Sequence, residues 1–366
     1  MSQDFPQARQ AIDVLPSYKA GRSVSAVSGL TPYKLSSNEL PFDPPQKLVD
    51  VLSSAGAASH RYPDPFASAL TAALAASLGL SADMVALGTG GVGVCQQIVQ
   101  AFCNAGDEVI FPWRSFEAYP IICGIAGAKQ VDVPLLADGT HDLHAMAAAV
   151  TDKTRMVFIC SPNNPTGRIV RHSDLVAFLS SVPSHVLVVI DEAYIEFNRD
   201  VDVQDSLTLL RTFSNVGILR TFSKAFGLAG LRVGYFVAHP PVIEAVRKTA
   251  VPFGVSSIAQ AVAVEALTLA IEFEQRIDLV VQRRVWLESE FEQRGIYVGV
   301  SQGNFVWWQL GELTNEFTEL CERYALAVRP FSGEGVRITI GEQEALDRLL
   351  NVIDTFVAEH PHVRDR

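Results

Sequence analysis

The sequence predicts an α/β protein with a mostly parallel central sheet in a large domain, followed by a smaller α+β domain. Two observations support this prediction. Up to about residue 250, short apolar runs alternate with helical stretches, which is the pattern of repeated βαβ units. Beyond about residue 255, a long helical run is followed by three short strands. A composition of 48% hydrophobic residues over 366 positions is enough to fill both cores.

The large domain is expected to span residues 41–250. Its strands are predicted from runs that are apolar on both faces, as in a parallel sheet covered by helices. These runs are MVAL, EVIFP, MVFIC, VLVVI, VGILR and VGYFVA. Helical periodicity lies between them, for example in VCQQIVQAFCNAG and HSDLVAFLSSV.

The small domain is expected to span residues 251–366. It opens with one long helical run over residues 256–295, after which NFVWWQL, LAVRPF and VRITIG are predicted to be short strands. Residues 1–40 contain prolines and little periodicity. We therefore expect residues 1–40 to form an arm that packs on the small domain.

The charge balance limits the classes of partner. Lys and Arg number 29 and Asp and Glu 40, and the net charge of −11 argues against nucleic acid or an anionic membrane as the main partner. No apolar run reaches the roughly 18 residues of a membrane span. The polar start MSQDFPQARQ lacks the apolar region of a secretory signal. The five scattered cysteines show no metal-ligand spacing, which predicts reduced thiols, a cytoplasmic location and no metal site.

The stretch GTGGVG, from Gly88 to Gly93, follows one predicted strand and precedes a helix. It fits the G-x-G-x-x-G pattern, so a nicotinamide-dependent oxidoreductase has to be considered. The acidic residue expected after the next strand is missing, because that strand runs into Pro112, Trp113 and Arg114. What remains is glycine-rich backbone at a helix N-terminus, whose N–H groups suit a phosphate. A tight turn without a ligand is the alternative.

Three later segments place polar groups directly after predicted strands. SPNNPTG carries Asn164, the run VLVVI ends at Asp191, and Lys224 lies among small and apolar residues in LRTFSKAFGLAGLRVGY. Each segment also has a simpler explanation. SPNNPTG can be an ordinary turn, Asp191 a helix N-cap and Lys224 a lysine at a helix end. Ligands of open α/β sheets bind at the carboxyl ends of the strands, however, so these groups and Gly90 are expected to meet in one crevice.

One ligand would use all of these groups. A phosphate suits the glycine turn together with Thr221, Ser223 and Arg232. An aldehyde would form a Schiff base with Lys224, and a basic ring nitrogen would pair with Asp191. Pyridoxal phosphate has all three features. Burial and nearby cations are expected to lower the pKa of Lys224, which keeps its amine neutral for use as a base.

SPNNPTG, DEAY and SKAFGLAGLRVGY together resemble the fold-type-I pyridoxal-phosphate aminotransferases, in the histidinol-phosphate aminotransferase-like branch. The similarity extends over nearly the whole chain, from KLSSNELPF through RYPDP to GVRITIG. GDEVIFPWRSFEAYP and CQQIVQAF resemble the aromatic-amino-acid (phenylalanine) aminotransferases more than the histidinol-phosphate enzymes. The latter usually carry a Gly-Ser-Asp-Glu type sequence at the phosphate turn, where this chain has Gly91, Val92 and Gly93.

The resemblance implies a role for each residue around the cofactor. Lys224 would carry the cofactor and move a proton between the substrate Cα and the cofactor. Asp191 would pair with the pyridine nitrogen. Asn164 and Tyr194 would bond the ring oxygen, and Phe116 would stack on the ring. The phosphate would be held by Gly90, Gly91, Thr221, Ser223 and Arg232.

The resemblance also implies substrate contacts and a partner. Arg337 would bind the substrate carboxylate as a two-pronged clamp beside Asn164. Tyr62 would reach the phosphate in the neighbouring subunit's site, which implies a homodimer. Both residues also have local explanations, as a strand-edge arginine and a turn tyrosine. An apolar pocket for an aromatic side chain would be lined by Tyr18, Tyr33, Trp113 and Phe116.

The expected reaction moves the amino group between an aromatic L-amino acid (phenylalanine, tyrosine or tryptophan) and 2-oxoglutarate. The alternative is a histidinol-phosphate aminotransferase, which needs further cationic groups for a second phosphate, and Arg22 and Arg329 are candidates for this. A lyase, decarboxylase or racemase would use the same cofactor. A nicotinamide oxidoreductase rests on GTGGVG alone. A regulator would need an added DNA-binding domain, and fewer than about 50 residues precede the core.

Overall fold

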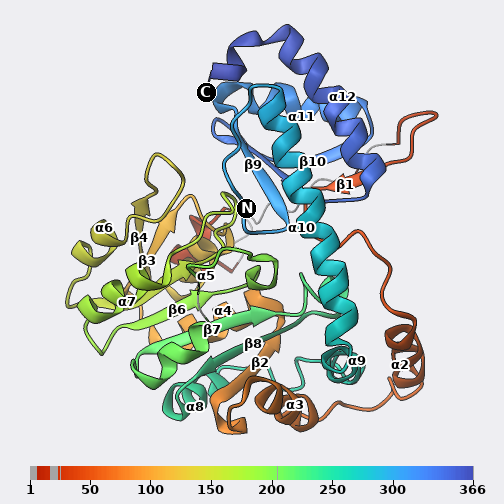
Figure 1. The fold of residues 1–366 in the computed structure, drawn as a ribbon. Coiled ribbons are helices and arrows are strands. Elements are labelled where there is room, and N and C mark those ends of the chain that lie inside the picture. The colour runs from red at the N-terminus through yellow and green to blue at the C-terminus, as the bar shows by residue number, and fades with distance from the viewer. Residues whose placement is uncertain (1–5, 17–23, 25, 204, 366) are drawn as a thin grey trace, which may run out of the picture.

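The computed structural model describes residues 6–16, 24, 26–203 and 205–365. Within these residues, a seven-stranded sheet with helices on both faces forms one layered unit, and a four-stranded sheet with its own helices lies beside it (Figure 1). This arrangement confirms the predicted α/β class, with a mostly parallel sheet and a smaller α+β unit.

The large sheet has the strand order β2-β8-β7-β6-β5-β3-β4. All neighbouring strands are parallel except β8, which runs antiparallel to both β2 and β7. The six predicted apolar runs all form strands of this sheet. The strand bounds are β2 Val85–Thr89, β3 Glu108–Trp113, β4 Lys129–Pro134, β5 Thr154–Cys160, β6 Leu187–Asp191, β7 Val216–Thr221 and β8 Val233–Ala238.

The two faces of the large sheet belong to two separate cores, because side chains alternate along a strand. In β5, Met156 and Phe158 pack in one core, and Val157 and Ile159 in the other. The first core is covered by α4 Gly90–Phe102, α5 Ala118–Ala126 and α8 Pro240–Lys248. Helices of the opposite core include α2 Gln46–Gly56, α3 Ser68–Leu78, α6 Leu143–Ala148, α7 His172–Ser181 and α9 Ser257–Leu267.

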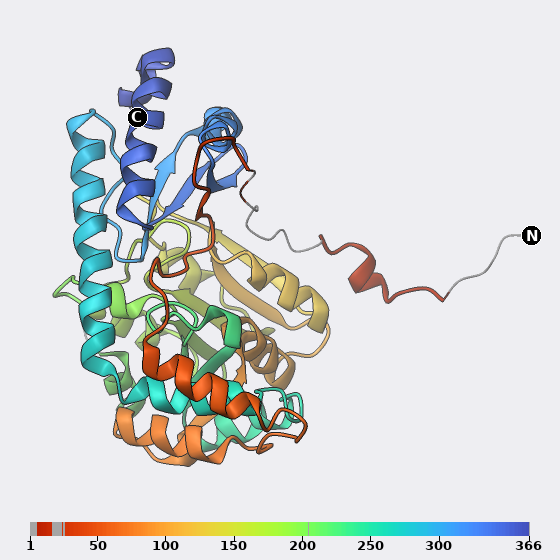
Figure 2. The same ribbon diagram turned by 90° about the vertical axis from the view of Figure 1, so that its right-hand side faces the viewer.

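The small sheet has the order β1-β10-β11-β9 and combines both ends of the chain. Strand β1, from near the start of the chain, pairs in parallel with β10, and the other pairs are antiparallel. Figure 2 shows α10 running from the level of the large sheet up along the small one. The bounds are β1 Tyr33–Leu35, β9 Phe305–Gln309, β10 Leu326–Phe331, β11 Gly335–Thr339, α10 Ala270–Gln293, α11 Thr314–Arg323 and α12 Gln343–Glu359.

The long helical run predicted over residues 256–295 is two helices, α9 and α10. The chain bends between them at Thr268 and Leu269, where the Thr268 hydroxyl donates a hydrogen bond to the Glu265 carbonyl. Such a local bond competes with helix continuation. As a result α9 packs against α2 and α3, whereas α10 reaches the small sheet (Figure 1).

Strand β4 was not predicted, because it is an edge strand and only Val133 of its six residues is buried. The short helix α1 Gln10–Asp13 packs on α5, where Arg9 Nη2 donates to the Ile125 carbonyl at 2.8 Å. The connections contain five short 3-10 turns in the described residues, and a sixth, η6 Pro361–Asp365, follows α12. The five are η1 Ala82–Met84, η2 Ile195–Phe197, η3 Ser206–Arg211, η4 Ala229–Leu231 and η5 Gly311–Leu313.

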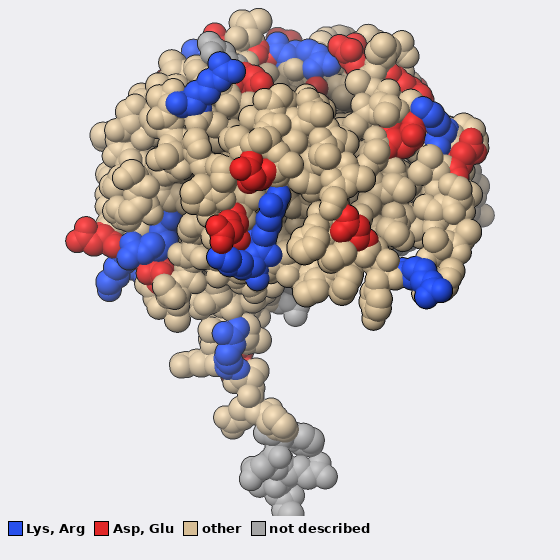
Figure 3. Space-filling model, turned by 90° about the horizontal axis from the view of Figure 1, so that it is seen from below, with Lys and Arg blue, Asp and Glu red and all other residues tan. Residues whose placement is uncertain are grey.

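Charged side chains are scattered on the face shown in Figure 3, with acidic and basic groups interspersed and wide uncharged areas between them. Among the helices that the structure describes, none combines the length and apolar composition needed to cross a membrane.

Candidate active site

A cavity of about 390 Å³ lies where the carboxyl ends of β5, β6 and β7 meet the small sheet. Its walls come from segments far apart in the sequence. The crossover connections between parallel strands bring these segments to the carboxyl-end edge of the sheet. The predicted residues that line it are Gly91, Phe116, Asn164, Asp191, Tyr194, Thr221, Ser223, Lys224, Arg232, Arg329 and Arg337.

Lys224 follows β7, and its Nζ donates a hydrogen bond to the Ser37 carbonyl at 3.0 Å. Burial lowers the pKa of Lys224 to about 7, and the cationic Arg337 contributes to the lowering. The amine is therefore partly neutral near pH 7, as a nucleophile or a general base requires.

Asp191 ends β6 inside the fold, where the Tyr119 hydroxyl donates to its Oδ2 at 2.5 Å and the Ala193 N–H to its Oδ1 at 3.2 Å. Burial raises the pKa of Asp191 to about 6. In the described part of the chain no lysine or arginine pairs with this carboxylate. A buried carboxylate in this setting suits a cationic ligand group, such as a protonated ring nitrogen.

Tyr119 is a site residue that the sequence did not reveal. It is fully buried, and its ring stacks on Phe158 with centroids 4.5 Å apart. The packing fixes the hydroxyl against Asp191. In the sequence Tyr119 is one aromatic residue in an apolar helix, so no local pattern distinguishes it.

The glycine turn and the Lys224 segment form a cradle with little free space. Gly90 begins α4 at a φ of 75°, and a Cβ there would collide with the Arg232 guanidinium. A Cβ on Gly234 would lie 2.6 Å from the backbone of Gly90 and Gly91. Arg232 Nη1 donates to the Ser223 hydroxyl at 3.3 Å. Backbone N–H groups, a hydroxyl and a guanidinium thus gather at one helix N-terminus, which suits a phosphate.

The opposite wall holds Arg337, on β11 of the small sheet. Its Nη1 donates to Asn164 Oδ1 at 2.6 Å and its Nη2 to the Ser36 carbonyl at 2.7 Å. The structure therefore brings Arg337 and Asn164 together, as the resemblance implied. Arg337 is 8% exposed and lines the cavity, where its guanidinium N–H groups can donate to a carboxylate.

Residues 36–38 were also not expected at the site, although they lie in the KLSSNELPF segment that carries part of the family resemblance. Asn38 is fully buried and donates from Nδ2 to the Tyr194 hydroxyl at 3.0 Å. Its Oδ1 accepts from the Thr339 hydroxyl of β11 at 3.0 Å. Asn38 thus connects Tyr194 with the strand that carries Arg337.

The predicted residues Tyr33, Trp113 and Tyr62 do not line this cavity. Tyr18 and Arg22 are outside the described residues. The Tyr33 hydroxyl donates to Glu344 at 2.6 Å, away from the cavity, and Trp113 lines a second cavity of about 630 Å³. Tyr62 is 83% exposed, with its ring 4.8 Å from that of Phe253.

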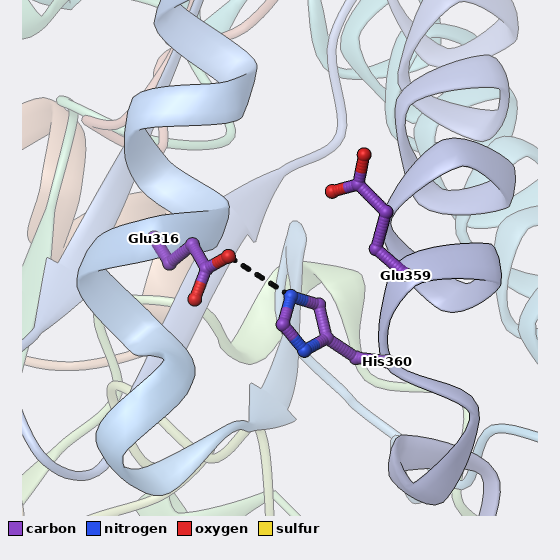
Figure 4. A group of neighbouring side chains, drawn as sticks. All are labelled: Glu316, Glu359 and His360. Atoms are coloured by element: carbon purple, nitrogen blue, oxygen red, sulfur yellow. Dashed lines mark hydrogen bonds and ion pairs between the residues drawn. The ribbon is translucent and has the colours of Figure 1, made fainter.

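Among the residues that the structure describes, Glu316, Glu359 and His360 form a group with metal-ligating atoms within 4.8 Å of one another (Figure 4). Both carboxylates are exposed, and the His360 ring lies 2.9 Å from Glu316. Glu316 is in the first turn of α11, and His360 caps the end of α12. A hydrogen bond between a carboxylate at the start of one helix and an imidazole at the end of another accounts for the contact without a metal ion.

Comparisons with known proteins agree with this geometry. Residues 31–353 match the family model described as aminotransferase class I and II. A protein of Streptomyces coelicolor named aromatic amino acid aminotransferase is 50% identical over 98% of this chain and 100% of its own length. A protein of Thermobifida fusca with the same name is 49% identical to this chain over 96% of this chain and 97% of its own length.

A solved structure of a related enzyme supports the same family assignment. Histidinol-phosphate aminotransferase from Sinorhizobium meliloti, in complex with pyridoxal 5'-phosphate, superposes with a TM-score of 0.87 at 27% identity, over 97% of this chain and 99% of that one. The chain therefore belongs to the class I and II aminotransferase family, and its cofactor is pyridoxal phosphate. The resemblance to the fold-type-I enzymes is confirmed.

The residues present fit this cofactor. The cradle at Gly90 and Arg232 suits its phosphate, the buried Asp191 suits its ring nitrogen, and the amine of Lys224 suits its aldehyde. All three groups border or adjoin one cavity.

Proposed function

We propose that this protein transfers the amino group of an aromatic L-amino acid (phenylalanine, tyrosine or tryptophan) to 2-oxoglutarate. The observation that carries the reaction type is the juxtaposition of Lys224, Asp191 and Arg337 around one cavity. The observation that favours aromatic substrates is the name shared by relatives that are 49–50% identical over nearly the full chain. Phe116 in the cavity wall supplies an apolar surface for such a side chain.

The proposed mechanism assigns one task to each group. Pyridoxal phosphate, when bound, supplies a ring that withdraws electrons from the substrate Cα. Arg337 holds the substrate carboxylate with two parallel hydrogen bonds and thereby fixes the Cα–H bond beside Lys224. The neutral Nζ of Lys224 would take the proton from the substrate Cα and deliver it to the cofactor, not back to Cα.

Three further groups hold the cofactor in place in this proposal. The Asp191 carboxylate, oriented by Tyr119, keeps the ring nitrogen protonated. Asn164 and Tyr194 bind the ring oxygen, and Phe116 packs on the ring. The phosphate is held by Gly90, Gly91, Thr221, Ser223 and Arg232.

A single-turnover experiment tests the substrate. The purified protein loaded with cofactor is mixed separately with L-phenylalanine and L-histidinol phosphate without an oxo acid, and the visible absorption of the bound cofactor is followed. Fast loss with phenylalanine and slow loss with histidinol phosphate is the expected result. The reverse order would make the protein a histidinol-phosphate aminotransferase. A protein that takes up no cofactor would overturn the proposed role of Lys224.

We also propose that the active unit is a homodimer in which Tyr62 completes the partner's phosphate site. Tyr62 and Phe66 are more than three-quarters exposed, at 83% and 80%, and Phe253 and Val251 beside them are also exposed. An exposed aromatic patch of this kind favours a protein interface. The five free thiols support a reducing, cytoplasmic location.

Subunit mixing tests this assembly. A Lys224→Ala subunit and a Tyr62→Ala subunit are each expected to be weakly active alone. A mixed dimer places an intact Lys224 and an intact Tyr62 in the same site, so mixing is expected to restore up to about half of the wild-type activity per mixed dimer. If mixing restores nothing while sedimentation shows that mixed dimers form, Tyr62 does not act across the interface.

A further inference from the structure

Two arginines of the small sheet face the same cavity. Arg329 on β10 is the direct cross-strand partner of Arg337 on β11, and both are 8% exposed. Like charges opposite each other on antiparallel strands repel, and burial makes each charge more costly. This wall of the cavity therefore favours two anions. One is the substrate carboxylate at Arg337, and the other binds at Arg329.

A carboxylate of the protein itself is bound to the second arginine. Arg329 Nη2 donates to Glu117 Oε2 at 2.6 Å, and both residues line the cavity. Glu117 directly precedes α5 and follows Phe116, which also borders the cavity. The ion pair thus lies beside the surface on which an aromatic side chain would pack.

The two members of this pair differ in their freedom to move. The Arg329 side chain is 9% exposed and lies in a strand with the Phe331 ring 5.6 Å away, whereas the Glu117 side chain is 30% exposed at a helix start. A carboxylate with that access to water keeps much of its hydration when it leaves the pair, but the buried guanidinium does not. Glu117 is therefore the partner that can be displaced.

We propose that Glu117 is a specificity-determining residue, which occupies on Arg329 the place of the distal carboxylate of a dicarboxylic substrate. This inference rests on the proposed function, in which an aromatic and a dicarboxylic substrate use one cavity in turn. An aromatic side chain packs beside the intact Glu117–Arg329 pair, which presents no net charge. A five-carbon dicarboxylate displaces Glu117 toward solvent and takes over Arg329.

The pair also lowers the affinity for dicarboxylates. Every dicarboxylate has to compete with Glu117, whereas an aromatic monocarboxylate does not. Removing the Glu117 charge should therefore strengthen dicarboxylate binding and leave aromatic binding nearly unchanged.

The test compares two unreactive ligands on the cofactor-loaded enzyme. Glutarate represents the dicarboxylic substrate and 3-phenylpropionate the aromatic one, and dissociation constants are read from the cofactor absorption. In Glu117→Gln the dissociation constant of glutarate is expected to fall about fivefold, the upper end for a partly exposed ion pair. That of 3-phenylpropionate is expected to change less than about twofold. The matched control Glu117→Asp keeps the charge and should keep the wild-type ratio of the two constants.

A double-mutant cycle shows whether Glu117 competes with the dicarboxylate for Arg329 or instead holds Arg329 in position for it. If Glu117 competes for Arg329, the variant Arg329→Gln binds glutarate weakly and adding Glu117→Gln changes nothing further. If Glu117→Gln instead weakens glutarate binding, Glu117 merely positions Arg329 and the proposal is overturned. An unchanged ratio of the two constants in Glu117→Gln also overturns it.

Steady-state kinetics supply a second readout. Glu117→Gln should lower the KM for 2-oxoglutarate at nearly constant kcat, a split that a general loss of structure does not produce. A wild-type enzyme that fails to transaminate phenylalanine overturns the proposed function, whereas the binding ratio of the two ligands tests Glu117 independently of turnover.

Discussion

The floor and the roof of the cavity are built in different ways. The floor consists of residues at or just beyond the ends of β5, β6 and β7, such as Asn164, Asp191 and Lys224. The roof consists of Arg329 and Arg337 on the small sheet together with residues 36–38. Its hydrogen bonds join groups far apart in sequence, for example 301 residues between Arg337 and Ser36. In the proposed mechanism, the floor provides the cofactor chemistry and the roof selects the substrate.

The largest effect should come from the floor, at Lys224. Lys224→Ala removes both the bond to the cofactor and the base, so turnover should fall by about 10⁴-fold or more. Pre-steady-state and steady-state assays with phenylalanine and 2-oxoglutarate measure this loss. A variant that retains substantial turnover would contradict the assignment of the floor.

The next largest loss of activity is expected when the buried carboxylate of Asp191 is replaced. Asp191→Asn leaves a ring nitrogen without its anion, and the loss of one partner of a buried charge pair costs about 3–5 kcal/mol. We expect kcat/KM to fall by roughly 10²- to 10⁴-fold. Tyr119→Phe, which keeps the carboxylate but removes one hydrogen bond to it, should cost only about 1.5–3 kcal/mol. Equal losses in both variants would mean that Asp191 acts mainly through packing.

A roof substitution should affect substrate binding more than cofactor binding. Arg337→Lys keeps the charge but loses the two-pronged geometry, so kcat/KM should fall by roughly 10- to 100-fold. The affinity for pyridoxal phosphate, measured by titration of the apoenzyme, should stay within about twofold of wild type. A parallel loss of cofactor affinity would show that floor and roof are not separable.

The smallest expected effect is a pH dependence within the floor. Only the neutral amine attacks an aldehyde, and burial lowers the pKa of Lys224 to about 7 instead of the usual 10.5. The rate at which the apoenzyme takes up pyridoxal phosphate should therefore rise about tenfold between pH 6 and 8 and then level off. A rate that continues to rise toward pH 10 would mean that the amine is not desolvated.

The difference between floor and roof also explains which site residues the sequence could predict. Floor residues follow apolar strands immediately, so local motifs are sufficient to locate Asn164, Asp191 and Lys224. The contact of Tyr119 with Asp191 depends on how α5 packs on the sheet, and no sequence pattern encodes it.

The roof was predicted only in part. Arg337 was found through the family resemblance. Asn38 of the roof, and Glu117, which binds the roof residue Arg329, make tertiary contacts with residues 301 and 212 positions away. Tyr33 and Trp113 were expected in the pocket because they are aromatic and lie in the N-terminal arm and near Phe116. Both lie outside it, because their strands present them to other surfaces. The break between α9 and α10 was hidden by helical periodicity that continues across it.

The pairing of β1 with β10 has a consequence for synthesis of the chain. Residues 85–238, which contain every strand of the large sheet, leave the ribosome well before β10 at residues 326–331. Because domains made first fold first, the cofactor site can form while the small sheet is still missing. Strand β1 is made before every strand of the large sheet, yet its partner strand β10 is made after all of them. In the proposed mechanism, the nascent protein would thus acquire the site that holds its cofactor early, and the site that chooses its substrate only after β10 and β11 have been made.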